Sequence, residues 1–240
     1  MADNEELQNH LRKNIFLVKS ALDWTVEYAI SAGQKSETFA YIPKIWEDDA
    51  FLIKKDQEEA ENITVSPKTA QVFIPLSQID NLHDLLHESI HRLGILQINV
   101  RGNLLLPQIA ETFDLQLVLK DSKNINPDSF DLVLPSPGDY QTAKNHLVNV
   151  YERLLEGITE WLTQFTNTLS REHGYALFED LSQKYSKEVE LIEKIKSGLS
   201  QKALSDQHAN AILIAFSLTG DAEALQSKLS GDFLKFLNEF

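Results

Sequence analysis

The chain has 240 residues, 42 % of them hydrophobic and 24 % charged, so it can bury a sizeable core as one large domain or two small ones. Its formal net charge of −14 disfavours nucleic acid and anionic membranes as main partners. The absence of cysteine excludes disulfide bonds and thiolate metal sites.

The first residues, MADNEELQNHLRKN, lack the basic and apolar segments of a secretion signal. No stretch of the sequence is apolar for long enough to cross a bilayer. We therefore expect a soluble protein that is cytoplasmic, or one that is exported without a cleaved signal peptide.

The first element in chain order is one long amphipathic helix from Glu5 to about Ser31, which is expected to end near Gly33. Residues 34–76 change character. Four short segments there have the composition of strands and are separated by polar turns: FAYIP, AFLIKK, NITV and AQVFIPL.

A second helix is predicted from Ser77 or Asp80 to about Leu93, where Gly94 supplies a stop. A hairpin around residues 101–103 and a strand in FDLQLVL are expected to follow. A long helix over 141–169 comes next, and then several helices broken at Gly198, Gly220 and Gly231.

These elements predict an α+β fold, with a small strand-rich N-terminal half that carries one histidine-bearing helix and a mainly helical C-terminal half. No repeat or linker requires a domain boundary. We therefore expect one domain over 1–240, with sub-regions 1–33, 34–140 and 141–240.

The stretch NLHDLLHESIHRLG, residues 81–94, carries three histidines at a spacing of four. His87 and His91 belong to an H-E-x-x-H motif, and this spacing places both imidazoles on one helix face, where they can bind one zinc ion. Glu88 lies about 100° further round the turn, within reach of a water on the metal. His83 is interpreted as a surface histidine or one that lies behind the ligands without binding the metal. The alternative for the whole stretch is a polar stripe on an ordinary amphipathic helix.

A catalytic zinc also needs a third protein ligand, and two glutamates are candidates. Glu111 follows His91 at the spacing of thermolysin-like enzymes. Glu156 lies farther along, on the long predicted helix, and Glu160 one turn later is placed to hydrogen-bond a ligating imidazole. We favour Glu156. Gly157 in mid-helix costs about 1 kcal/mol relative to alanine, which close approach of the backbone to the histidine helix or to a substrate would explain.

Together, HESIH and LLEGITEWLTQ resemble the gluzincin metallopeptidases, HExxH zinc enzymes whose third ligand is a glutamate on a later helix. The resemblance covers roughly residues 70–230. It implies a zincin-like fold, zinc bound by His87, His91 and Glu156, and Glu160 as the residue that orients a histidine. It also implies that AQVFIPL is the edge strand along which an extended peptide lies.

The resemblance implies a zinc metallopeptidase that hydrolyses peptide or protein substrates with a zinc-bound water activated by Glu88. The donor to the oxyanion is expected from residues after the ligand helix, with Tyr185 preferred over His173 and Tyr175. One alternative function is a catalytically inactive zincin-fold protein with an interaction or regulatory role. Another is a helical scaffold in which both motifs are accidental.

Overall fold

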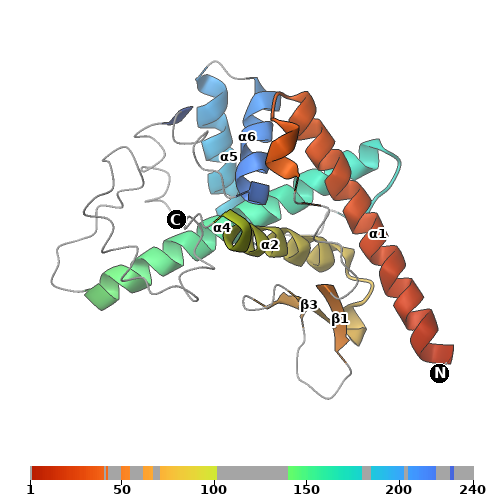
Figure 1. Ribbon diagram of the computed structural model, residues 1–240. Coiled ribbons are helices and arrows are strands. Elements are labelled where there is room, and N and C mark those ends of the chain that lie inside the picture. The colour runs from red at the N-terminus through yellow and green to blue at the C-terminus, as the bar shows by residue number, and fades with distance from the viewer. Residues whose placement is uncertain are drawn as a thin grey trace.

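The computed structural model describes residues 2–40, 42, 50–54, 62–66, 71–101, 140–179, 185–202, 205–219 and 228–229 (Figure 1). Helices account for 76 % of them. The helices and strands in chain order are α1 (Ala2–Ser31), η1 (Ser36–Phe39), β1 (Phe51–Lys54), β2 (Thr64–Val65), β3 (Val72–Pro75), η4 (Leu76–Gln78), α2 (Leu82–Arg101), α4 (Tyr140–Glu172), α5 (Ser186–Gln201) and α6 (Asp206–Thr219).

The predicted α+β, zincin-like fold with a strand-rich N-terminal half is wrong. The N-terminal half is dominated by α1, of 30 residues, and by α2, of 20 residues, and its described strands have only two to four residues each. Phe39 of the predicted strand FAYIP belongs to the 3-10 helix η1, where its side chain is buried. Short apolar runs suit either conformation, and tertiary burial decides between them.

The predicted stop at Gly94 is also wrong, because α2 continues to Arg101 through the first half of the predicted hairpin. A single glycine costs a helix only about 1 kcal/mol, which the rest of a long helix can offset. The α5 helix likewise continues through Gly198, where a break was expected. The predicted strand FDLQLVL and the predicted break at Gly231 lie outside the described residues.

The three described strands form one small sheet in the order β1-β3-β2. β1 pairs parallel with β3, and β2 pairs antiparallel with it, so that Phe51 and Val65 both face Val72 across the sheet. The segment AQVFIPL, which contains β3, was expected to be an edge strand, but it is the central one. Its inward side chains, Val72 and Ile74, are fully buried, which suits a strand with neighbours on both sides.

The helix α2 lies between the sheet and the other helices (Figure 1). It contacts β2 and β3 on one side and α4 and α6 on the other. Its apolar side chains Leu85, Leu86, Ile90 and Leu93 are at most 1 % exposed. The histidine face of α2 is also covered, since His87 and His91 are 3 % and 4 % exposed.

Glycine ends the two longest helices in the same way. Gly33 after α1 and Gly174 after α4 adopt positive φ angles of 102° and 86°. In each case the glycine N–H and the next N–H donate back to the last turn, for example from Gly33 to Ile30 and from Gln34 to Ala29. This arrangement is the Schellman motif, in which glycine avoids the Cβ strain of the left-handed conformation. The predicted end of α1 at Gly33 and the predicted long helix over 141–169 are confirmed.

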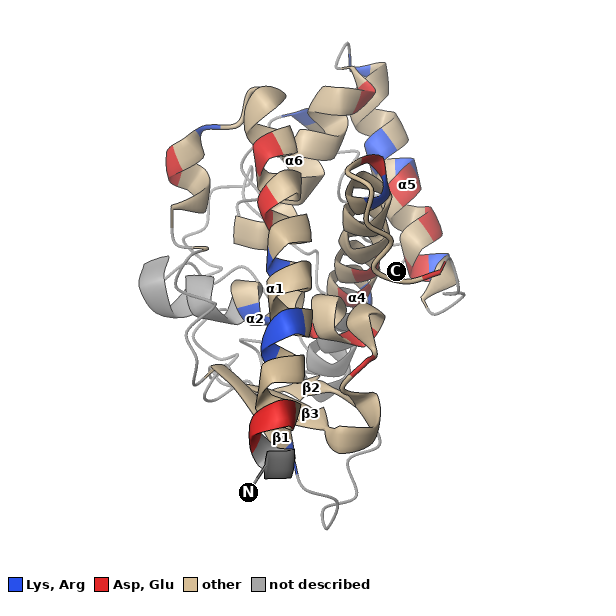
Figure 2. Ribbon diagram, turned by 90° about the vertical axis from the view of Figure 1, so that its right-hand side faces the viewer, with Lys and Arg blue, Asp and Glu red and all other residues tan. Residues whose placement is uncertain are grey.

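Charged residues of both signs occupy α1 and α5 (Figure 2). By contrast, α6 is buried from Ala211 to Thr219 and packs against α1, α2, α4 and α5. Within the described part of the chain, no helix is both long enough and apolar enough to cross a membrane.

Candidate metal centre

Three predicted metal ligands come together where α2 and α4 meet. His87 and His91 lie one turn apart on α2, and their Nε2 atoms are 3.0 Å from each other. The Oε2 atom of Glu156, on α4, lies 3.2 Å from Nε2 of His87 and 3.4 Å from Nε2 of His91. The structure therefore places one donor atom of each residue at the corners of a nearly equilateral triangle.

This triangle has the dimensions of one face of a tetrahedral zinc site. With metal–ligand bonds of about 2.0–2.1 Å, neighbouring donors in a tetrahedron are about 3.3–3.4 Å apart. Two imidazole nitrogens and one carboxylate oxygen also form a donor set of catalytic zinc sites, which leaves the fourth position open. The group His87, His91 and Glu156 could therefore hold a metal ion.

The carboxylate of Glu160 lies behind His87 and is completely buried. Its Oε2 atom is 3.1 Å from Nδ1 of His87. An ionised carboxylate can only accept, so His87 donates from Nδ1 to Glu160, and Nε2 is the ring nitrogen that can bind a metal. This is the tautomer that a metal ligand requires, and a carboxylate in this position commonly fixes it.

His83 lies one turn before His87 and contacts the same carboxylate. Its Nε2 atom is 3.0 Å from Oε1 of Glu160, and its Nδ1 atom is 2.8 Å from Oδ1 of Asp84. Burial alone would lower the pKa of His83, but the two hydrogen-bonded carboxylates outweigh it and raise the pKa to about 9. The contact of His83 with Glu160, whose carboxylate lies behind His87, agrees with the interpretation that His83 stands behind the candidate ligands.

The carboxylates that face histidines are held ionised. Burial would raise the pKa of Glu156, but hydrogen bonds with His87 and His91 reverse this and hold it well below its usual range. The pKa of Glu160 is low for the same reason, with His83, His87 and Gln164 as donors. The pKa of His87 is raised against the effect of burial by its hydrogen bonds with Glu156 and Glu160. The metal-free site therefore holds protons that a cation would displace.

Glu88 stands beside the donor triangle, in a different environment. Its Oε2 atom accepts a hydrogen bond from the backbone N–H of Val65 in β2, at 3.1 Å. Burial is the main cause that raises the pKa of Glu88, and the negative charge of Glu156 adds to it. A carboxylate with a raised pKa, anchored by strand β2, holds a proton more readily than an exposed glutamate does.

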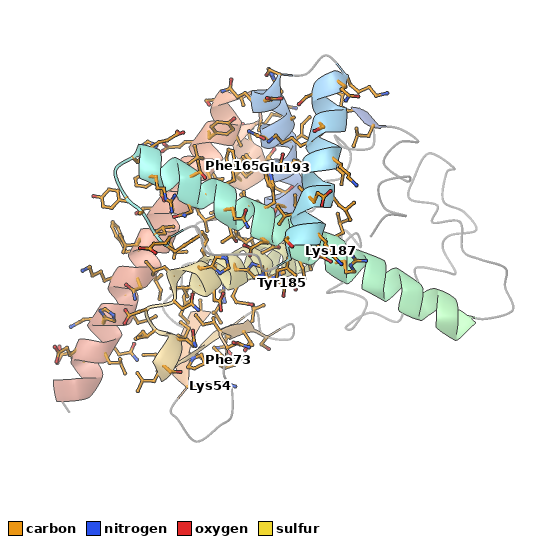
Figure 3. The ribbon with its side chains drawn as sticks, turned by 180° about the vertical axis from the view of Figure 1, so that it is seen from behind. Lys54, Phe73, Phe165, Tyr185, Lys187 and Glu193 are labelled. Atoms are coloured by element: carbon orange, nitrogen blue, oxygen red, sulfur yellow. The ribbon has the colours of Figure 1, made fainter. Side chains whose placement is uncertain are left out.

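Tyr185 reaches the site from the start of α5, beside α2 (Figure 3). It adopts a left-handed conformation with φ of 57°, and its ring stacks on the ring of His87 with 5.8 Å between centroids. Burial and the negative charge of Glu156 raise the pKa of Tyr185, so its hydroxyl remains protonated. Its two sequence alternatives, His173 and Tyr175, both stack on Trp24 instead.

Gly157, next to the candidate ligand Glu156, allows α5 to approach α4 closely. A Cβ atom at position 157 would lie 2.8 Å from Cβ of Glu188 and 3.1 Å from the backbone carbonyl of that residue. From the sequence we expected a close contact at Gly157, with the histidine helix or a substrate as its partner. The partner is the first turn of α5, the helix that begins directly after Tyr185.

Two contacts of the site were not predicted. Gln164 donates from Nε2 to Oε1 of Glu160 at 2.9 Å. The sequence could have predicted this contact, because Gln164 lies one helical turn after Glu160. The hydrogen bond from Val65 to Glu88 gives no signal in the sequence, because any residue except proline supplies an N–H there. The other candidate third ligand, Glu111, lies outside the described residues.

Comparisons with protein-family models, with curated proteins and with solved structures found no match to this chain. The resemblance to gluzincins therefore stays a prediction from the two motifs. The geometry shows only that His87, His91 and Glu156 could hold a metal ion.

Proposed function

We propose that the chain is a zinc-dependent hydrolase that cleaves peptide bonds, with His87, His91 and Glu156 as metal ligands in the manner of gluzincins. The single observation that supports this most is the triangle of donor atoms, with sides of 3.0, 3.2 and 3.4 Å, beside the carboxylate of Glu88. The side chain of Glu156 is 32 % exposed, so solvent reaches this ligand position.

A zinc ion held there would act as a Lewis acid on the scissile carbonyl and would make a water more acidic. Glu88 accepts a proton from the attacking water and donates it to the leaving amine, a role that its raised pKa favours. Glu160 keeps His87 in the ligating tautomer. The protonated hydroxyl of Tyr185 donates a hydrogen bond to the oxyanion that develops.

Metal content and peptide cleavage test the proposal together. Protein purified without a histidine tag is expected to contain one zinc per chain and to cleave members of a peptide library. Glu88→Gln should retain the zinc and lose cleavage by at least about a hundredfold, because the amide cannot take up the proton. Glu190→Gln, an exposed acid of α5, is the matched control and should behave as wild type.

Absence of zinc from the wild-type protein would contradict the proposal at its first step. Stoichiometric zinc without cleavage of any library peptide would contradict the hydrolase and favour a catalytically inactive, metal-binding interaction protein. Retained cleavage in Glu88→Gln would show that another group accepts the proton.

A further inference from the structure

His83, the first of the three histidines on α2, has a hydrogen-bond partner at each of its ring nitrogens. Its side chain is 15 % exposed, and each ring nitrogen faces a carboxylate oxygen, of Glu160 on one side and Asp84 on the other. A neutral imidazole can donate from only one nitrogen, whereas two carboxylate partners both accept. His83 therefore satisfies both partners only when both of its nitrogens donate.

The two oxygens of Glu160 have separate partners. Oε1 accepts from His83 on α2 and from Gln164 on α4, at 3.0 and 2.9 Å, and Oε2 faces Nδ1 of His87. Because His83 and Gln164 hold Oε1 from two helices, the carboxylate cannot rotate without losing a hydrogen bond. Its other oxygen is thereby aimed at the metal ligand.

The ring of His83 is itself held in place by a turn after α4. The ring of Phe178 meets it edge to face, with 4.9 Å between centroids. The backbone of Phe178 is fixed by Asn167, a buried residue of α4 whose amide nitrogen donates to its carbonyl at 3.1 Å and whose oxygen accepts from its N–H at 3.3 Å. Contacts that immobilise His83 in this way suit a residue whose task is orientation.

We propose that His83 is a positioning residue of the metal centre, which holds the carboxylate of Glu160 so that Oε2 accepts the Nδ1–H of His87. The HExxH pattern does not contain this residue, and the inference rests on the proposed zinc site. His83 does not contact the metal or the substrate. It acts through Glu160, and its removal should change how well His87 binds zinc.

Zinc affinity, measured by competition with a chromophoric chelator, tests this relation directly. His83→Phe keeps an aromatic ring against Phe178 but donates nothing, so zinc affinity should fall about tenfold or more, as for other groups behind a ligand. His83→Gln keeps one donor for Glu160 and should restore most of the affinity. His208→Phe makes the same chemical change at an exposed histidine of α6 and should leave zinc affinity unchanged.

A double-mutant cycle separates positioning from a general structural role. If His83 acts through Glu160, then His83→Phe should cause no further loss of affinity once Glu160→Gln is present. An additive loss in the double variant would overturn the proposal, as would wild-type affinity in His83→Phe.

A measurement on the wild-type protein covers the case in which a variant does not fold. In the zinc-loaded protein, the ring N–H protons of His83 and the Nδ1–H of His87 should be visible by NMR and protected from exchange with water. Free exchange at the ring of His83 would overturn the inference. Failure of the wild type to bind zinc would overturn the proposed function as well, and zinc binding without cleavage would overturn the hydrolase while leaving the role of His83 intact.

Discussion

The three carboxylates of the candidate metal centre differ in what surrounds them. Glu156 and Glu160 face imidazoles, and their pKa values are lowered despite burial. Glu88 receives one backbone hydrogen bond, and burial raises its pKa. Groups of the same chemistry whose pKa values are driven apart by their surroundings commonly have different roles. The proposed function gives these groups different roles: Glu156 and Glu160 stay ionised, and Glu88 exchanges a proton.

His83 should make the stability of the metal-free protein depend on pH. Its pKa is raised to about 9 in the folded state, from the ordinary value of 6.5 for an unperturbed histidine. Its contribution is therefore fully present below about pH 6.5 and is lost as the pH rises through 9. We expect a loss on the order of 2 kcal/mol between pH 6.5 and 9.5, measured by chemical denaturation with a chelator present.

The same pH series on His83→Phe is the comparison for this prediction. The variant lacks the titrating ring, so its free energy of unfolding should change less than that of the wild type between pH 6.5 and 9.5. Parallel curves for the two proteins would contradict the prediction.

The pairing of α4 with α5 brings Tyr185 to the site. Arg153 of α4 forms an ion pair with Glu188 of α5 at 2.9 Å, and Nε1 of Trp161 donates to Oε1 of Glu193 at 2.7 Å. Gly157 lies between these two contacts on α4, where a Cβ atom would come within 2.8 Å of Glu188. Residues at intervals of one turn on α4 thus fix α5 against it. Tyr185 lies just before the first turn of α5.

Gly157→Ala should disturb this pairing. The added Cβ meets the Cβ and backbone of Glu188 at 2.8 and 3.1 Å, so α5 must shift. We expect the free energy of unfolding to fall by about 1–3 kcal/mol, as for other overpacked sites, although alanine favours a helix more than glycine does. Thermal or chemical denaturation measures the change.

Thr168→Ala, at an exposed position of the same helix, is the control and should have little effect on stability. A displaced α5 also moves Tyr185, so Gly157→Ala should slow peptide cleavage more than it weakens zinc binding. A variant as stable as the wild type, or more stable, would show that the two helices are not in close contact at Gly157.

Local patterns predicted the elements that depend on local spacing. The helical repeat of apolar residues and Gly33 gave α1, and the repeat over 141–169 gave α4. The interval of four on α2 placed His87 and His91 on one face, and the acid one turn after Glu156 was a guide to the third ligand. Each of these inferences needs only the geometry of a single helix.

Features that depend on packing between distant segments were missed or wrong. The central place of β3 depends on which strands flank it, and the covered face of α2 depends on α4 and α6. The partner of Gly157 depends on the path of the chain into α5. Such contacts join residues far apart in sequence, and a pattern within one element does not contain them.

If zinc binds as proposed, it should stabilise the whole molecule, because His87, His91 and Glu156 join α2 to α4 across a long separation in sequence. A ligand that binds only the folded state at a hundred times its Kd adds about 2.7 kcal/mol to stability. For a chain of this size we expect the Tm to rise by about 5–10 °C on addition of zinc, measured by scanning calorimetry.

Glu156→Gln is the variant that tests the origin of this shift. It replaces the ligand carboxylate by an amide of the same shape, so zinc should raise its Tm far less. Glu190→Gln, on the surface of α5, should keep the full shift. An equal rise in Glu156→Gln would place the stabilising zinc elsewhere on the chain.

The polar groups that join α2 and α4 repeat every fourth residue on both helices: His83, His87 and His91 on one, and Glu156, Glu160 and Gln164 on the other. Sliding α4 by one turn, about 5.4 Å, would bring Glu160 to the imidazoles that Glu156 now faces. Gln164 would then stand behind His87 with no negative charge to offer. The uncharged amide thus makes the two alignments unequal, and a glutamate in its place would let either one assemble a complete set of ligands.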